Sequence, residues 1–269
     1  MDKKELEERV AILNTIQPWN HNYLLPYGVE TRPGEQVSHG KNLVKWQRIQ
    51  PLVEILKIGN KTVLDVGCNE GFFSFKLADM GSHVMGIDID ENRIKKAMFI
   101  QEIFNKSSVS FSVMDIFSEA FSTLPHFNIC LCLGMLHRLP DPYTAISKLT
   151  QYADIIIFEW KSLKFGPHDQ PFAYYTSDGY NELDFYGTQY WLMSFACVEA
   201  ILSHLGYHRF HRLDDPRYRR AILVAGKVDN PIFDLPDTIL HRGRLRTLLS
   251  HTKRYMISIG KILNGDINA

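Results

Sequence analysis

One stretch of the sequence constrains the fold more than any other. Residues 63–71 read Val-Leu-Asp-Val-Gly-Cys-Asn-Glu-Gly, an apolar segment that runs into a turn bracketed by Gly67 and Gly71. A helix-like segment follows over 72–80, and a second apolar segment ends in Asp88. A strand, a glycine turn, a helix and a second strand ending in an acid make half of a nucleotide-binding fold. The stretch therefore predicts a parallel sheet with a ligand at the carboxyl ends of its strands.

The turn itself is not suited to a diphosphate. Dinucleotide-binding turns read G-x-G-x-x-G, because the middle glycine lets the backbone approach a pyrophosphate. Here Asn69 stands where that glycine would be. S-adenosylmethionine (SAM) has no diphosphate, its methionine end can pack against small residues, and Asp88 can accept hydrogen bonds from both ribose hydroxyls. The turn favours SAM over a dinucleotide, and the alternative is a parallel-sheet turn without a ligand.

The rest of the chain alternates strand-like and helix-like segments. Apolar runs such as 155–158 are typical of strands buried on both faces, and their alternation with helices predicts a doubly wound α/β fold with a mostly parallel sheet. Five strands are expected over 62–67, 83–88, 109–114, 127–133 and 153–159, and the segments 207–213 and 220–226 make a closing pair, giving a seven-stranded sheet. Helices are expected over 71–80, 91–104, 141–152 and 194–205, and apolar spacing predicts an N-terminal pair over 2–17 and 41–57.

Composition narrows the class of protein. A chain of 269 residues can bury one large core, and a formal net charge of zero gives no global field that attracts nucleic acid. The cysteines lack metal-ligand spacing, so we expect reduced thiols in a cytoplasmic protein: Cys68, Cys130, Cys132 and Cys197. No stretch approaches the roughly 18 apolar residues of a membrane span, and the charged N-terminal segment has no signal-peptide core.

These motifs resemble those of the class I SAM-dependent methyltransferases. Residues 109–116 resemble that family's third strand and the acid after it, 127–133 its fourth strand, and 134–142 the loop that follows. The resemblance covers about residues 60–227. It implies a Rossmann-like methyltransferase fold in which the closing pair puts one antiparallel strand into the sheet.

The strand ends and the resemblance together give candidates for donor binding. Asp65 would orient the turn or the donor's amino group, Asp88 would bind the ribose, and Asp115 would face the adenine amino group, although Asp115 can also be an ordinary loop acid. The full set of cofactor-binding candidates is Asp65, Gly67, Asn69, Gly71, Asp88, Ile89, Asp115, Ile116 and Gly134.

Candidate catalytic residues follow the fourth and fifth strands. His137 is the first candidate for acceptor contact or general base, because a pKa of about 6.5 suits proton transfer, and its alternative is a loop histidine bonded to backbone. Arg138 can clamp an anionic acceptor or form a surface salt bridge, and Glu159 can be a base or a structural acid. The eleven histidines show no ligand cluster, so no catalytic metal is expected.

A narrower resemblance begins upstream of the sheet. Pro-Trp-Asn-His at 18–21, Tyr-Gly-Val-Glu-Thr at 27–31 and Gly-Met-Leu-His-Arg at 134–138 resemble the tRNA wobble-uridine 5-oxyacetate-forming (carboxymethyl) transferase group. Members of that group transfer a carboxymethyl group from carboxy-SAM to 5-hydroxyuridine in tRNA. They bind the extra carboxylate partly through a lysine just after the Pro-Trp pair, where this chain has His21, and their tyrosine before the His-Arg pair has no counterpart, since Leu136 precedes His137. These departures predict ordinary SAM as the donor.

We interpret the chain as a SAM-dependent methyltransferase that acts on an oxygen, or alternatively a nitrogen, of a small-molecule, sugar or RNA acceptor. Three parts are expected: a helical extension and covering loop over 1–59, a SAM-binding domain over 60–227 with an aromatic insertion at 160–192, and a basic tail over 228–269. The alternatives are a tRNA-modifying carboxymethyltransferase and a non-catalytic SAM-binding protein. A nicotinamide oxidoreductase is disfavoured by the glycine pattern.

The expected partner is a small-molecule or sugar acceptor rather than tRNA, because the chain is neutral overall. Five arginines could instead follow an RNA backbone or form a solvated face: Arg209, Arg212, Arg217, Arg219 and Arg220. The tail suits a helix for a partner, an anionic lipid surface or RNA, or docking onto its own domain. An oligomer does not follow from the sequence.

Overall fold

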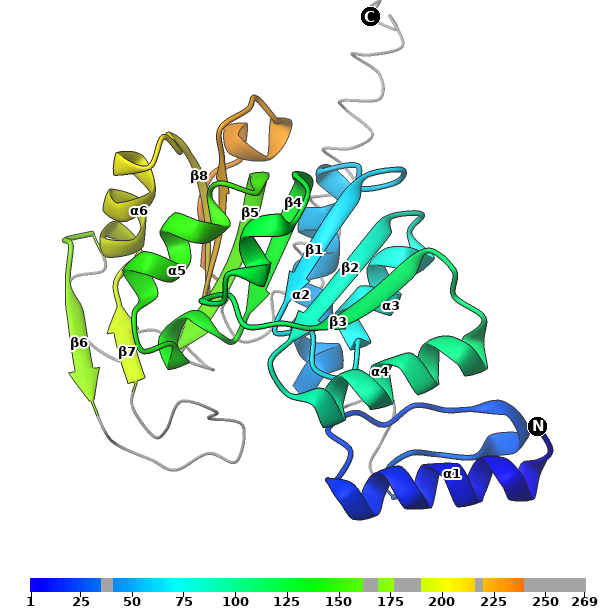
Figure 1. Cartoon of the computed structure of the whole chain (residues 1–269). Helices are drawn as coiled ribbons and strands as arrows, with labels where there is room; N and C mark the ends of the chain where they lie inside the picture. Colours follow the sequence, from blue (N-terminus) through cyan, green and yellow to red (C-terminus); the bar gives the residue numbers. More distant parts are fainter. Residues whose placement is uncertain (35–40, 162–168, 177–189, 216–219, 240–269) are drawn as a thin grey trace, which may run out of the picture.

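A single central sheet organises the protein. The computed structural model describes residues 1–34, 41–161, 169–176, 190–215 and 220–239. The strands of this sheet are β1 (Thr62–Val66), β2 (His83–Asp88), β3 (Val109–Val113), β4 (Phe127–Leu133), β5 (Ala153–Lys161), β8 (Arg209–Asp215), β9 (Arg220–Gly226) and β10 (Thr238–Ile239). Their order across the sheet is β3-β2-β1-β4-β5-β9-β8-β10 (Figure 1).

The strand directions confirm the predicted topology. β1 pairs in parallel with β2 and β4, β2 with β3, and β4 with β5. β9 runs antiparallel to both β5 and β8, so one antiparallel strand lies inside an otherwise parallel sheet. The seven expected strands are all present, and the two-residue β10 adds an eighth at the edge beside β8, within the segment predicted to be tail.

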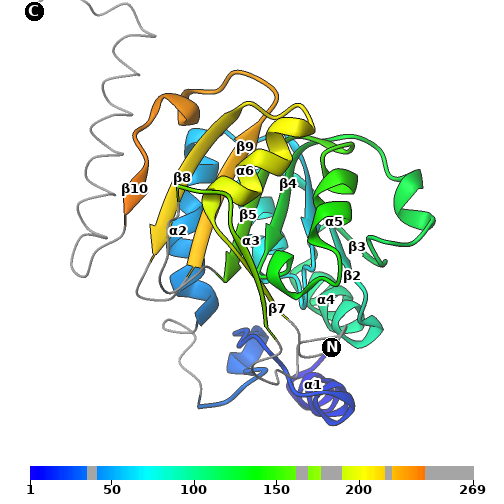
Figure 2. The ribbon, with the colours of Figure 1, turned by 90° about the vertical axis from the view of Figure 1, so that its left-hand side faces the viewer.

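Helices cover both faces of the sheet and create two apolar layers. α2 (Lys41–Ile55), α3 (Phe72–Asp79) and α4 (Glu91–Phe104) contribute to one layer, whereas α5 (Pro142–Leu149) and α6 (Phe195–His204) contribute to the other. Figures 1 and 2 show α5 and α6 on the face opposite α2. Alternate residues of a strand point to opposite faces, so in β1 Val63 packs into the first layer and Leu64 into the second. The carboxyl ends of the parallel strands carry the turns that build the candidate site.

The N-terminal helix α1 (Lys3–Ile16) lies beside α4 and adds to the first of these layers (Figure 1). Asp2 caps it by accepting a hydrogen bond from the Glu5 backbone N–H at 2.9 Å. Leu6 and Val10 are buried, and Arg9 makes two hydrogen bonds to Glu102 of α4, at 3.0 and 2.8 Å. The predicted amphipathic helix is therefore present and docks on the domain.

The aromatic insertion contains a short hairpin that the sequence analysis did not predict. β6 (Ala173–Thr176) pairs antiparallel with β7 (Tyr190–Met193), and the rings of Tyr175 and Trp191 lie 4.9 Å apart across the pair. Cross-strand aromatic pairs of this kind stabilise short hairpins. Residues 162–168 and 177–189 of the insertion and the basic residues of the tail lie outside the described residues. No helix in the described ranges has the length and apolar character needed to cross a membrane.

Candidate functional site

The turn between β1 and α3 bends sharply through residues with positive φ. Gly67, Asn69 and Gly71 have φ of 70°, 55° and 83°. A Cβ atom added to Gly71 would lie 2.6 Å from the Phe111 ring, so only glycine fits there. The backbone N–H groups of Gly67 and Cys68 both donate to the carbonyl oxygen of Ile87, at 2.8 and 3.0 Å. The turn is thereby held against the end of β2.

Asp88 lies at that end of β2 and is fixed by two backbone donors. Its Oδ2 accepts from the Asn69 N–H at 2.8 Å and its Oδ1 accepts from the Asp90 N–H at 3.0 Å. Burial raises the pKa of Asp88, and these hydrogen bonds offset part of the rise. Each carboxylate oxygen keeps a further lone pair, so an oriented acid that can accept two hydroxyl groups stands beside the glycine turn.

Asp65 is a second acid behind the same turn. Its Oδ2 accepts a hydrogen bond from the Ser74 hydroxyl at 2.6 Å, and the residue is 2% exposed. Burial, with a further contribution from the charge of Asp88, raises the pKa of Asp65 to about 6, although the Ser74 hydrogen bond and Lys45 act in the opposite direction. Two carboxyl groups with raised pKa values beside one turn favour a cationic ligand. The residues present therefore fit SAM, which carries an ammonium and a sulfonium.

The candidates for the adenine surround the end of β3. Asp115 is half-buried and its Oδ1 accepts from the Phe117 N–H at 2.8 Å, so the carboxylate is partly engaged by its own loop. Ile116 is buried in the layer that contains Leu64, and Ile89 is half-buried directly after Asp88. These positions are compatible with an adenine between the ends of β2 and β3, and the contacts themselves stay a prediction.

The turn after β4 meets the turn after β1. Gly134 donates its N–H to the carbonyl oxygen of Glu159 at 2.8 Å. A Cβ atom on Gly67 would collide with the sulfur of Met135, which shows that the Met135 side chain lies over the glycine turn. Gly134, a donor candidate, thus directly precedes a residue that covers the candidate cradle.

A buried carboxylate with two cations lies next to Gly134. The Nζ atom of Lys45 is 3.2 Å from Glu159 Oε2, and the Nε atom of Arg220 is 3.4 Å from Oε1. A Cβ atom on Gly134 would lie 3.3 Å from Lys45 Nζ. Glu159 is 1% exposed, and among the described residues its oxygens face these two cations without a well-aligned hydrogen bond. This arrangement favours the structural alternative for Glu159, as an anchor for cations beside the site, over a free base.

His137 is buried in the short helix Leu136–Arg138 among positive charges. Burial lowers the pKa of His137 well below its ordinary value, and Arg220, Arg138, Lys45 and Lys161 lower it further by repulsion. The imidazole is therefore neutral at neutral pH. The neutral ring can accept a hydrogen bond but is a weak base, and its catalytic role stays a prediction.

Some of the candidate catalytic residues lie close together in the structure. His137 and Glu159 lie near the same two cations, Lys45 and Arg220, and Arg138 acts on His137 as well. His21 is not part of that group, because its Nδ1 lies 3.1 Å from Glu70 Oε2. Sequence reasoning missed Lys45 and Glu70, whose partners are remote in the chain.

The arginines proposed to follow an RNA backbone are largely engaged within the protein. Arg212 makes charged hydrogen bonds to Glu199 and to Asp169, Arg209 pairs with Asp229, and Arg220 faces Glu159. Arg217 and Arg219 lie outside the described residues. The described arginines therefore support the alternative of a solvated face rather than a nucleic-acid surface.

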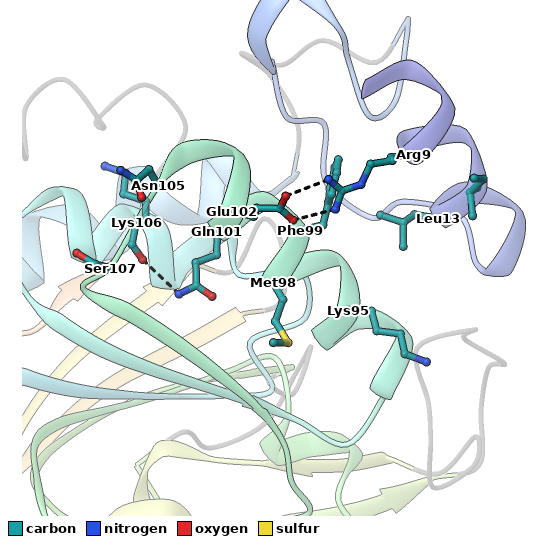
Figure 3. A pocket seen from close by; sticks show the side chains of 11 residues that line it. Arg9, Leu13, Lys95, Met98, Phe99, Gln101, Glu102, Asn105, Lys106 and Ser107 are labelled. Carbon is teal, nitrogen blue, oxygen red and sulfur yellow. Dashed lines mark hydrogen bonds and ion pairs between the residues drawn. The ribbon is translucent and has the colours of Figure 1, made fainter. Parts of the chain in front are cut away.

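A hollow of about 670 Å³ lies elsewhere, between α1 and α4 (Figure 3). Its lining comes from α1, from α4 and from the turn after α4, and the Arg9–Glu102 ion pair crosses it. It shares no residue with the turns after β1 and β4. Within the described ranges, no group of three or more His, Cys, Asp or Glu side chains is arranged to hold a metal ion.

Comparisons with known proteins also indicate a methyltransferase domain. The family described as "Methyltransferase domain" matches residues 58–156. The tRNA U34 carboxymethyltransferase of Nautilia profundicola is 28% identical over 149 residues, which are 55% of this chain and 46% of the relative. A ubiquinone biosynthesis O-methyltransferase of Pseudomonas fluorescens is 37% identical over 101 residues, 37% of this chain and 42% of the relative. The chain spans less than half the length of these curated relatives.

Solved structures show the same fold. The N-terminal domain of EvdMO1, crystallised with S-adenosylhomocysteine (SAH) and D-fucose, has a TM-score of 0.69 at 18% identity and covers 85% of this chain and 98% of that chain. Magnesium protoporphyrin IX methyltransferase from Synechocystis, with bound SAM, has a TM-score of 0.51 at 22% identity and covers 70% of this chain and 82% of that chain. This protein therefore shares the Rossmann-like fold of these solved structures.

Proposed function

We propose that this chain, which carries a class I SAM-dependent methyltransferase domain, transfers a methyl group from SAM to an oxygen of a small-molecule or sugar acceptor. The observation that carries the proposal is the pairing of a glycine turn with two acids, Asp65 and Asp88, whose pKa values are raised by burial. Two carboxylates close together beside one turn favour a ligand that carries positive charge, as SAM does.

Each part of the donor has a proposed partner. Asp88 would bind the ribose hydroxyls, Asp65 and the turn at Gly67 would hold the methionine end, and Asp115 with Ile116 would border the adenine. SAM supplies a methyl group on a positively charged sulfur, which is already activated for in-line displacement. The protein then contributes mainly alignment, an effect that can lower a barrier by roughly 7–11 kcal/mol.

The charges beside the site favour an oxygen acceptor over a nitrogen acceptor. An attacking hydroxyl loses its proton and develops negative charge, whereas an attacking amine develops positive charge. Lys45, Arg138 and Arg220 all act on His137, which places positive charge beside the turn after β4. Positive charge stabilises an oxyanion and opposes an ammonium. A neutral His137 is suited to accept a hydrogen bond from such a hydroxyl.

A second candidate function is carboxymethyl transfer from carboxy-SAM, for which the named tRNA U34 carboxymethyltransferases among the relatives are one reason. The specific observation in its favour is that Lys45 and Arg220 flank the turn at Gly134, where a donor carboxylate could be paired. Against it, His21 replaces the expected lysine and is held by Glu70.

The test is a transfer assay with two donors and three acceptor pools. Purified protein would be incubated with labelled SAM or carboxy-SAM and with total tRNA, sugars or phenolic and hydroxy-acid metabolites, and products would be analysed by mass spectrometry. We expect methyl transfer from SAM to a hydroxyl in a small-molecule pool. Carboxymethylated tRNA would establish the second candidate, and bound SAM without any transfer would indicate a non-catalytic SAM-binding protein.

A further inference from the structure

Residues 17–21 connect α1 with the rest of the protein and contact both turns that form the candidate donor site. At the β2 side, Gln17 Nε2 donates to Asp90 Oδ2 at 3.1 Å, and Asp90 is the residue whose N–H orients Asp88. At the β1 side, Asn20 Nδ2 donates to the side-chain oxygen of Asn69 at 3.3 Å. The segment therefore stands directly outside the turns at Asn69 and Asp88. We call residues 17–21 the outer wall.

Glu70 is the residue that ties the outer wall to the glycine turn. Its carboxylate is fully buried and accepts from the backbone N–H of Asn20, at 2.9 and 3.0 Å, and of His21, at 2.8 Å. The Nδ1 atom of His21 adds a contact at 3.1 Å. Burial alone would raise the pKa of Glu70, but these donors and the charges of His21 and Lys96 reverse that effect and lower it. The carboxylate is therefore ionised, and its hydrogen-bonding capacity is filled by the outer wall.

Lys96 of α4 closes the network from the opposite side. Its buried Nζ donates to the carbonyl oxygens of Gln17 and Pro18, at 2.6 and 2.9 Å, and lies 3.4 Å from Glu70 Oε1. Burial lowers the pKa of Lys96, and His21 and the Asn20 N–H contribute more than Lys96 does to lowering the pKa of Glu70. Glu70 and Lys96 thus both make their hydrogen bonds mainly to the backbone of residues 17–21.

This arrangement is more specific than core packing requires. A buried carboxylate and a buried ammonium each carry a desolvation penalty, and apolar residues of similar size can fill such a space at least as stably. What the charges add is direction, because Glu70 accepts from two consecutive backbone N–H groups and fixes their orientation. The side chain between those groups, Asn20, is the one that reaches Asn69.

We propose that Glu70 is a positioning residue that holds residues 17–21 as the outer wall of the donor site, so that SAM affinity depends on a charge that does not itself contact SAM. The proposal rests on SAM as the donor. It gives the N-terminal extension a role in donor binding and names Asn20 as the wall residue nearest the donor.

The test compares two matched substitutions, Glu70→Gln and Glu199→Gln. Glu199 also accepts charged hydrogen bonds, from Arg212, but on α6 and away from the donor turns. Both variants are expected to lower the melting temperature. Glu70→Gln is expected to weaken SAM binding by about tenfold or more in calorimetry on folded protein, and Glu199→Gln to leave it unchanged. In the transfer assay, Glu70→Gln is expected to raise KM for SAM with little change in kcat.

Unchanged SAM affinity in folded Glu70→Gln would overturn the proposal and leave Glu70 a stabilising residue only. If that variant does not fold, Asn20→Ala decides, because it removes the contact to Asn69 without uncovering a buried charge: weaker SAM binding would support the wall, and unchanged binding would overturn it. Wild-type protein that binds SAM but transfers nothing would count against the proposed function and not against this role of Glu70. Absence of SAM binding by the wild-type protein would overturn both.

Discussion

Asp65 is a residue whose charge changes within a readily accessible pH range. Its pKa is raised to about 6 in the folded protein, mainly by burial. An acid with a raised folded pKa favours the folded state below its unfolded pKa of about 3.9, and that contribution is lost as pH rises through about 6. Above that pH the ionised Asp65 therefore opposes folding, while its negative charge is what a cationic donor requires.

Asp65→Asn should separate these two effects. The amide keeps an oxygen for the Ser74 hydroxyl and removes the buried charge, so at pH 8 we expect the free energy of unfolding to rise by on the order of 1–3 kcal/mol, with little gain at pH 4. SAM binding at pH 8 should weaken, and wild-type affinity should fall below about pH 6. Denaturant titrations and calorimetry at both pH values measure this, with exposed Asp79→Asn as the control. Equal destabilisation of Asp65→Asn at both pH values would contradict the raised pKa of Asp65.

His137→Gln should leave SAM binding unchanged and slow transfer, because His137 belongs to the acceptor side of the site. Since its pKa lies well below the ordinary value, the wild-type rate should show no loss from protonation of His137 between about pH 6.5 and 8. Rate profiles against pH and SAM calorimetry check both statements, with His126→Gln at the opposite end of the sheet as the control. Full activity of His137→Gln would remove the residue from the mechanism.

At the residue scale, the sequence located candidates that belong to a local motif and missed those that depend on distant partners. Asp65 and Asp88 could be identified because a strand, a turn and a second strand lie within one short stretch. Glu70 stood inside that stretch, but its partners come from residues 20, 21 and 96. Lys45 and Arg220 meet Glu159 only after three elements pack together.

At the scale of elements, Ser194 connects helix α6 with the aromatic insertion. Its hydroxyl oxygen accepts from the Cys197 N–H at 3.1 Å as the helix cap and from the Phe172 N–H at 3.0 Å, and it donates to the Gln170 carbonyl at 2.7 Å. The start of α6 and the segment that leads into β6 are thus joined by one buried side chain.

Ser194→Ala should lower the free energy of unfolding by about 1–2 kcal/mol, at the upper end of the effect of losing a helix cap. The exposed cap of α1, Asp2→Ala, is the control and should cost less, because water can replace its bond. Limited proteolysis of the insertion should also become faster in Ser194→Ala. Equal, small losses in both variants would contradict a connecting role for Ser194.

One helix with clear local start and stop signals was predicted to the residue, whereas the hairpin of β6 and β7 was not predicted. The helix predicted over 91–104 is α4, whose ends are set by the Asp90 cap and by Asn105 in the left-handed region. β6 and β7 were missed, because their pairing depends on a cross-strand contact between Tyr175 and Trp191 rather than on a local pattern.

For the whole molecule, the distribution of charge predicts weak binding to RNA. The formal net charge is zero, and Arg209, Arg212 and Arg220 are paired with acids of the same chain. We expect mobility-shift assays to show little retention of total tRNA at about 50 mM salt, and therefore no steep loss between about 50 and 200 mM. Tight binding with a steep salt dependence would show that residues outside the described ranges form a nucleic-acid surface.

The fold could be predicted at this scale and the acceptor could not. Alternating strands and helices define the sheet. The proposed acceptor side, around His137, instead combines residues of α2, the turn after β4, β5 and β9 with the neighbouring insertion. The division into an extension, a domain and a tail likewise stays a prediction, although the outer wall suggests that the extension and the domain function together.

The central claim is that the turns after β1 and β2 bind SAM, and calorimetric titration of SAH into the wild-type protein and Asp88→Ala tests it most directly. The wild-type protein should bind with a clear heat, and the folded variant should lose about 1–3 kcal/mol of binding free energy, the range for a hydrogen bond to a charged group. Equal affinity of the two proteins would remove Asp88 from the ribose site, and no binding by folded wild-type protein would contradict the account.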